Sequence, residues 1–103
     1  MFLINVTVKA HVSEQQQQAL LPSHVAWIQK YIEQGVLVLA GPYTDTPQPS
    51  GLLIANVESR AELEKVLAED CFYPELADYQ VREFEMKFVT PISSWKTLSQ
   101  NDD

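Results

Sequence analysis

The sequence has little of several residues that would mark particular chemistries. Its single cysteine, Cys71, excludes an internal disulfide and any cysteine-based zinc site within one chain. Seven basic residues stand against fourteen acidic ones, and the resulting net charge of −7 disfavours nucleic acid and anionic membranes as partners. No apolar run approaches the roughly 20 residues of a membrane span, and residues 1–10 lack the features of a signal peptide. We therefore expect a cytoplasmic protein.

The hydrophobic pattern predicts one α+β domain over residues 1–90, followed by a tail over residues 91–103 whose one anchor is Trp95. Alternating or continuous apolar runs predict strands, and apolar residues at helical spacing predict helices. We expect strands at residues 2–9, 36–43, 52–57 and 79–89, and helices at residues 22–34 and 59–69.

Two local signals define the predicted helices. Pro22 suits a first helical turn, so we expect a short helical segment before it and a main helix that runs from it to Gly35. Val25, Ile28 and Ile32 form the expected apolar stripe of this helix, flanked by Trp27 and Tyr31. Residues 59–62, Ser-Arg-Ala-Glu, form a capping box that predicts the start of the second helix.

The element order βαββαβ predicts a ferredoxin-like fold, in which a four-stranded antiparallel sheet carries both helices on one face. Residues 36–40 and 52–55 are apolar in both directions, so the other face of the sheet would expose a large apolar patch on a monomer. Burial of that face against a second copy predicts a homodimer, or a higher assembly of dimers.

His24 is the main candidate for chemistry. It lies beside Trp27 at helical spacing, where it is either a packing histidine with one hydrogen-bonded nitrogen or part of a catalytic pair. In a ferredoxin-like layout Asp70, just past the second helix, can approach it, orient the ring and raise the basicity of the free nitrogen. The structural alternative for Asp70 is a solvated loop residue or a cap of the following turn.

Other polar residues are weaker candidates. We expect His11 to be exposed, and Glu83 and Glu85 to form a solvated surface rather than a metal site. Arg82 either binds an anionic substrate or pairs with surface carboxylates. Ser23 points about 100° away from its neighbour His24 on a helix, so we discount it as a nucleophile.

The ordered series "LPSHVAWIQKYIEQGVLVLAGPY", "GLLIANV", "EDCF" and "YQVREF" resembles the YCII-related (YciI-like) family over residues 2–88. The resemblance implies a dimeric ferredoxin-like α/β barrel, similar to muconolactone isomerase. It also implies an active site built from a histidine and an aspartate, which fall on His24 and Asp70. The chain departs from the family pattern at Cys71, where the family has proline, so the backbone after Asp70 is less restrained.

Two hypotheses follow from these residues. The first is a small enzyme without metal or organic cofactor, in which His24 and Asp70 perform acid/base chemistry of an isomerase, lyase or dehydrochlorinase type on a small cyclic or aromatic substrate. Its substrate-binding residues would be Trp27, Gly41, Phe72, Tyr73 and Arg82. The second is a non-catalytic dimer that binds a small molecule or acts as an accessory protein.

Overall fold

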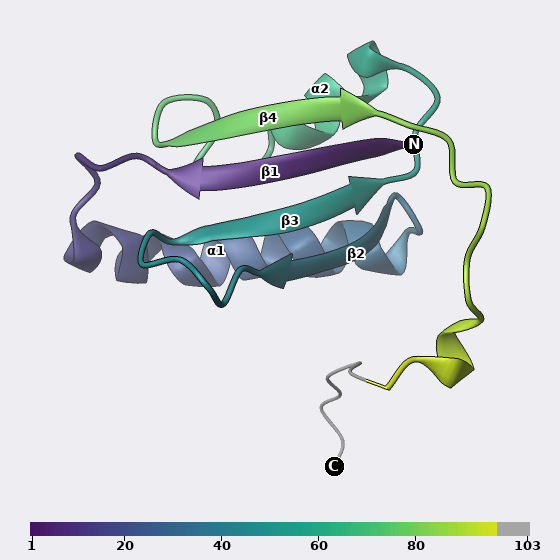
Figure 1. The fold of residues 1–103 in the computed structure, drawn as a ribbon. Coiled ribbons are helices and arrows are strands. Elements are labelled where there is room, and N and C mark those ends of the chain that lie inside the picture. The colour runs from purple at the N-terminus through teal and green to yellow at the C-terminus, as the bar shows by residue number, and fades with distance from the viewer. Residues whose placement is uncertain (97–103) are drawn as a thin grey trace.

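The fold is a single antiparallel sheet of four strands with two helices on one face. The computed structural model describes residues 1–96, and Figure 1 shows its elements in chain order. The strands, in the order β2-β3-β1-β4 across the sheet, confirm the predicted ferredoxin-like α+β arrangement. The elements are β1 (Phe2–Val8), α1 (Glu14–Glu33), β2 (Leu37–Pro42), β3 (Ser50–Ala55), α2 (Arg60–Leu67), β4 (Ala77–Glu83) and a short 3-10 turn, η1 (Ile92–Ser94).

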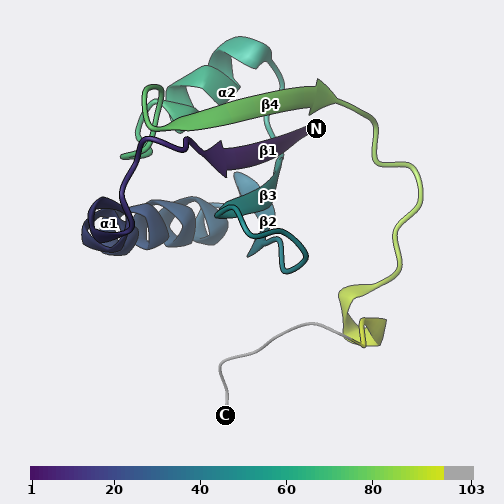
Figure 2. The same cartoon turned by 60° about the vertical axis from the view of Figure 1, so that its left-hand side comes forward.

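The register of the strands separates a buried face from an open one. Phe2 and Ile4 of β1 pair with Ala55 and Leu53 of β3, and all four are buried beneath the helices. Leu3, between them, belongs to the opposite face, which neither helix covers (Figure 2). The core therefore lies in one layer, between the sheet and the two helices.

Helix α1 is longer than predicted, and this part of the prediction is wrong. It begins at Glu14 and continues through Pro22 to Glu33 as one helix, where we expected two segments. The side chain of Ser13 accepts a hydrogen bond from the Gln16 amide and caps the start, and the glutamines that follow favour a helix. Pro22 removes one backbone hydrogen bond on an exposed side of the helix, and the turns on both sides hold without it.

The buried face of α1 also differs from the predicted stripe. Trp27 and Tyr31 are the buried residues of this helix, whereas Val25 and Ile32 are each 40 % exposed. The indole Nε1 of Trp27 donates to the carbonyl of Val66 on α2 at 2.9 Å, so the ring lies between the two helices. The two large aromatic residues, which we expected at the margin, form the centre of the contact.

The second helix and the central hairpin agree with the sequence prediction. Ser59 caps α2 by accepting from the Glu62 amide, and the Glu62 carboxylate accepts in return from the amide of Glu58, one residue before the Ser59 amide that a capping box uses. Strands β2 and β3 pair antiparallel, with one irregularity between Leu37 and Leu39. Gly35, in the left-handed region at φ 74°, makes the turn from α1 into this hairpin.

The last strand is shorter than predicted. β4 ends at Glu83, opposite Phe2, whereas the alternating pattern had predicted a strand up to Val89. Beyond this point residues 84–96 extend away from the sheet (Figure 1), and we call them the C-terminal arm. Trp95 does not anchor the arm to the domain, because its indole donates to Thr90 within the arm itself. The predicted tail from residue 97 onward lies outside the described residues.

Replacement of Pro22 by alanine should stabilise the protein. Alanine restores the missing amide in the middle of α1 and is the best helix former, so the free energy of unfolding should rise by about 1 to 3 kcal/mol. Urea unfolding followed by circular dichroism measures this change. Pro47→Ala, at an exposed site in the β2–β3 connection, is the control and should give no gain. A loss of stability in Pro22→Ala would show that the helix needs the proline.

Candidate functional site

The side chains of His24 and Asp70 meet between α1 and the turn after α2. The imidazole Nδ1 of His24 lies 2.8 Å from Asp70 Oδ1, a hydrogen-bonding distance, although 46 residues separate the two in the sequence. The Asp70 side chain is completely buried and that of His24 is 22 % exposed. The carboxylate therefore faces the protein interior, while the ring borders the surface.

Asp70 has a second partner that the sequence analysis missed. The hydroxyl of Tyr79, on β4, donates to Asp70 Oδ2 at 2.6 Å, and the amide of Phe72 lies 3.5 Å from Oδ1. Each carboxylate oxygen is thus hydrogen-bonded, as a buried carboxylate requires. A signal did exist in the sequence, because Tyr79 alternates with exposed residues on β4 and a buried tyrosine hydroxyl needs a partner.

Burial raises the pKa of Tyr79 well above its ordinary value, and the adjacent Asp70 carboxylate raises it further. The hydroxyl consequently keeps its proton and remains a hydrogen-bond donor to Asp70 throughout the neutral range. Because one carboxylate oxygen is occupied by this donor, the other is left for His24. Tyr79 therefore holds the carboxylate in the orientation in which its other oxygen faces His24.

Two aromatic rings hold the His24 imidazole. Trp27 stacks on it with ring centroids 5.8 Å apart, and Phe72 contacts it edge-on at 5.3 Å. Both rings are buried, Trp27 in the contact between the helices and Phe72 just after Asp70. The ring of His24 is thus restrained on its faces by packing and at Nδ1 by the carboxylate.

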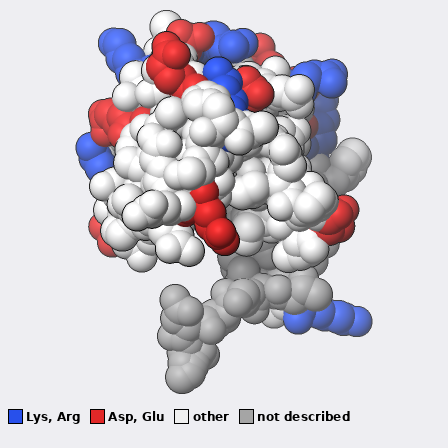
Figure 3. Space-filling model, turned by 90° about the vertical axis from the view of Figure 1, so that its left-hand side faces the viewer, with Lys and Arg blue, Asp and Glu red and all other residues white. Residues whose placement is uncertain are grey.

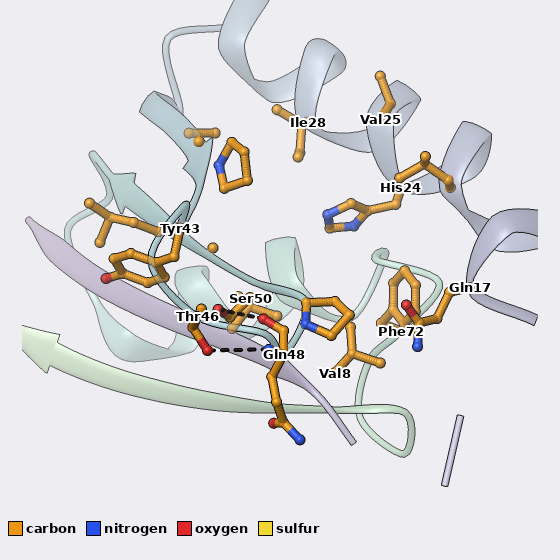
Figure 4. A pocket seen from close by; sticks show the side chains of 18 of the residues that line it. Val8, Gln17, His24, Val25, Ile28, Tyr43, Thr46, Gln48, Ser50 and Phe72 are labelled. Carbon is orange, nitrogen blue, oxygen red and sulfur yellow. Dashed lines mark hydrogen bonds between the residues drawn. The ribbon is translucent and has the colours of Figure 1, made fainter. Parts of the chain in front are cut away.

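The free edge of His24 borders a cavity of about 660 Å³ between α1 and the β2–β3 hairpin. Figure 4 shows His24, Val25 and Ile28 lining it from the helix, with Phe72 below and the β2–β3 connection opposite. The polar residues of its wall are chiefly uncharged, and they are Gln17, Gln18, Tyr43, Thr46, Gln48 and Ser50. No lysine or arginine lines the cavity among the described residues, and Glu14 is the one carboxylate in its wall. The end of the molecule where α1 begins shows a largely uncharged centre (Figure 3).

The structure brings together some of the predicted site residues and separates others. Gly41 and Phe72 line the cavity with His24. Trp27 lies behind the histidine in the core, and Tyr73 packs edge-on against Tyr79 at 5.0 Å, so neither forms part of the cavity wall. Arg82 pairs in register with Leu3 on the open face of the sheet, away from the cavity.

Cys71 does not displace Asp70 from His24. Its thiol is half-buried, and Sγ lies 3.5 Å from the carbonyl of Leu20 on α1, a position in which the S–H donates. Burial, and then the neighbouring Asp70, raise the pKa of the Cys71 thiol. The residue that stands in place of the family's proline thus contacts α1 directly, beside the turn that carries Asp70.

A second pair of side chains joins α1 to the turn after α2, here at the surface. Lys30 Nζ on α1 lies 2.9 Å from Glu69 Oε1, and both side chains are about half exposed, at 51 % and 47 %. The hydrogen bond to Lys30 lowers the pKa of Glu69, and the same bond raises that of Lys30. This pair parallels the His24–Asp70 pair but lies in solvent, so its contribution to stability is small.

Two further kinds of site are absent from residues 1–96. No three histidine, cysteine, aspartate or glutamate side chains in this range gather as metal ligands would. Neither described helix combines the length and the apolar composition that a membrane crossing requires.

These features define a class: small ferredoxin-like α+β domains in which a histidine paired with a buried aspartate borders a cavity. The chain belongs to the YCII-related family, because the model of the YCII-related domain matches residues 1–85. No curated protein matches the chain.

A solved structure also shares the fold. The chain is similar to a 5-chloro-2-hydroxyhydroquinone dehydrochlorinase from Burkholderia phenoliruptrix AC1100, solved in complex with 2,5-dihydroxybenzoquinone, with a TM-score of 0.65 and 19% sequence identity. The similarity covers 84% of this chain and 96% of that one. At this level of identity the likeness concerns the fold.

The bond between Tyr79 and Asp70 should make the stability of the protein depend on pH in the alkaline range. Because the pKa of Tyr79 is higher in the folded than in the unfolded chain, its stabilisation is complete below the unfolded pKa of about 10 and decreases above it. Tyr79→Phe lacks this dependence. The difference in unfolding free energy between wild type and Tyr79→Phe, measured with urea at neutral pH and at about pH 10.5, should therefore narrow at the higher pH. An equal difference at both pH values would contradict the assignment.

Proposed function

We propose that the protein is a small enzyme that uses His24 and Asp70 for acid/base chemistry on an uncharged cyclic or aromatic substrate. The observation that carries the proposal is the 2.8 Å contact between His24 Nδ1 and the buried Asp70 carboxylate, on a ring whose free edge borders a cavity. We place this activity in the cytoplasm.

The proposed chemistry follows from the two nitrogens of the ring. With Nδ1–H donating to Asp70, Nε2 carries the lone pair and can accept a proton from a substrate hydroxyl or C–H group. The carboxylate stabilises the imidazolium that forms. The electron pair left on the substrate forms a new π bond and either expels a leaving group, which takes the proton as HX, or is reprotonated at another carbon. The first outcome is elimination, such as dehydrochlorination, and the second is isomerisation; neither needs an oxidant.

The cavity supports an uncharged substrate. A carboxylate group on the ligand would find no lysine or arginine in the described wall and would lie near Glu14. Amide and hydroxyl side chains can instead hydrogen-bond ring oxygens, and Val25, Ile28 and Phe72 can pack against the ring. The ligand of the similar dehydrochlorinase, 2,5-dihydroxybenzoquinone, is a small ring with oxygens of this kind.

Substitutions of the pair test this proposal. We would measure chloride release from 5-chloro-2-hydroxyhydroquinone and the binding of 2,5-dihydroxybenzoquinone. His24→Ala should lower kcat by roughly 10²- to 10⁴-fold because the proton acceptor is lost, and Asp70→Asn should lower it less. Glu69→Gln is the matched control: it removes the neighbouring carboxylate, which pairs with Lys30 in solvent, and should leave kcat unchanged.

The outcomes separate the two functional classes. Binding of the quinone without chloride release by the wild type would favour a non-catalytic binding or accessory protein. Full activity in His24→Ala would exclude the acid/base role. If the wild type neither binds the quinone nor releases chloride, this substrate class is ruled out.

We also propose that the protein is a homodimer that buries the open face of its sheet. Leu3, Leu39 and Leu52 lie on this face and remain partly exposed in one copy. An apolar sheet face that no helix covers is stabilised when a second copy covers it, and two-fold dimers are the commonest assemblies.

A charge on the open face should prevent this association. Leu3→Lys places an ammonium group among apolar side chains and should shift the protein toward monomers in light scattering at micromolar concentration. Glu33→Lys, on the exposed surface of α1, is the control and should remain dimeric. A wild-type protein that is monomeric at these concentrations would contradict the proposal.

A further inference from the structure

One face of α1 lines the cavity along most of the helix. The residues on this face recur every three or four positions, as a helical stripe requires, and they are Glu14, Gln17, Gln18, Leu21, His24, Val25 and Ile28. Apart from His24, the polar members of the stripe lie at the start of the helix, and the apolar members follow from Leu21 onward. A ligand beside His24 can therefore contact apolar side chains toward one end of the cavity and polar ones toward the other.

The run of four glutamines at residues 15–18 is divided between the cavity and solvent. Gln17 and Gln18 line the cavity, whereas Gln15 and Gln16 are exposed and lie outside its wall. Gln17 is the half-buried member of the run, and it lies about two turns before His24 on the same face of the helix. Of the four, Gln17 is thus the glutamine whose side chain both packs against the domain and borders the cavity.

A hydrogen bond determines how the Gln17 carboxamide is oriented. Its Nε2 donates to the carbonyl of Val12, a buried residue, at 3.1 Å. A reversed carboxamide would place two oxygens against each other, and both only accept hydrogen bonds. The nitrogen is therefore held at Val12, which leaves the carboxamide oxygen, Oε1, for another donor. Figure 4 shows the Gln17 side chain among those that line the cavity, at the end where α1 begins.

The surroundings of Gln17 favour a donor without negative charge. Glu14 lies one turn before Gln17 in the same stripe and adds a carboxylate, whose oxygens also accept. Among residues 1–96, no lysine or arginine lines the cavity to hold an anion. A hydroxyl group fits this position because it can donate to Oε1, whereas an ether or carbonyl oxygen would face another acceptor.

We infer that Gln17 selects the substrate by accepting a hydrogen bond from a ring hydroxyl, while the reacting O–H or C–H group lies at His24 Nε2. The inference rests on the proposed acid/base function and narrows its substrate class to rings that carry a hydroxyl away from the reacting position. His24 and Gln17 are separated by about 10 Å along the helix axis, a distance that the two side chains and a hydroxylated ring between them can bridge. Because Gln17 contacts a part of the substrate that does not react, it contributes to binding and orientation.

The test compares the binding of hydroquinone with that of 4-methoxyphenol, in which one of the two hydroxyls is methylated. Hydroquinone can donate to His24 and Gln17 together, whereas 4-methoxyphenol can donate to one of them at a time. The wild type should bind hydroquinone roughly three- to tenfold more tightly, which corresponds to one net hydrogen bond. In Gln17→Met, which keeps the length of the side chain but lacks the carboxamide oxygen, this preference should nearly disappear. Titrations followed by NMR measure both affinities.

Gln16→Met is the matched control. It makes the same substitution at a neighbouring glutamine outside the cavity and leaves the bond from the Gln16 amide to Ser13 in place. This variant should keep the wild-type preference, and circular dichroism verifies that both variants are folded. Loss of the Val12 bond by itself would weaken the two ligands alike, so the ratio of their affinities reports on recognition rather than on stability.

The outcomes separate the role of Gln17 from the proposed function. A preference for hydroquinone that persists in Gln17→Met would overturn the role of Gln17 and leave the His24–Asp70 chemistry standing. Equal binding of the two ligands by the wild type would have the same meaning. A wild-type protein that binds neither ligand would overturn the inference together with the hydroxylated ring as substrate.

Discussion

The buried carboxylate of Asp70 is the constraint on which the site and much of the fold depend. A carboxylate with no exposed surface is costly unless each oxygen is hydrogen-bonded, and here the donors come from α1 and β4. His24 and Tyr79 can both reach it only when the helix, the turn after α2 and the last strand are correctly placed relative to one another. The position of the candidate base is thus determined by the same contacts that join helix, turn and sheet.

The His24 ring is packed against aromatic side chains on its faces and borders the cavity at its free edge. Trp27 and Phe72 restrain the ring, and Trp27 is itself held by its bond to Val66 on α2. The free edge, by contrast, meets a cavity wall of uncharged side chains. A ring that is fixed at one nitrogen and open at the other loses little freedom when a ligand binds, which is the condition for efficient proton transfer.

Sequence reasoning reached the architecture from element order, and it paired His24 with Asp70 from that layout together with the resemblance to the family. It did not find Tyr79, since alternation on a strand says that a side chain faces inward but not which group its hydroxyl will meet. It placed the start of α1 too late because Pro22 was given more weight than the Ser13 cap and the glutamines, which together support a helix across one missing hydrogen bond. Trp27 was assigned to the pocket wall because its contact with α2 depends on how the helices pack, which no local pattern records.

The end of β4 shows a different limit of sequence reasoning. The alternation over residues 84–89 is a strand pattern, yet a strand also needs a paired neighbour, and the register of β4 with β1 runs only as far as Glu83, opposite Phe2. Alternation indicates to which side successive side chains of a strand would point, whereas the formation of the strand depends on the backbone that lies beside it. A sequence pattern can therefore extend past the end of the strand that it predicts, as it does here over side chains as exposed as Phe88.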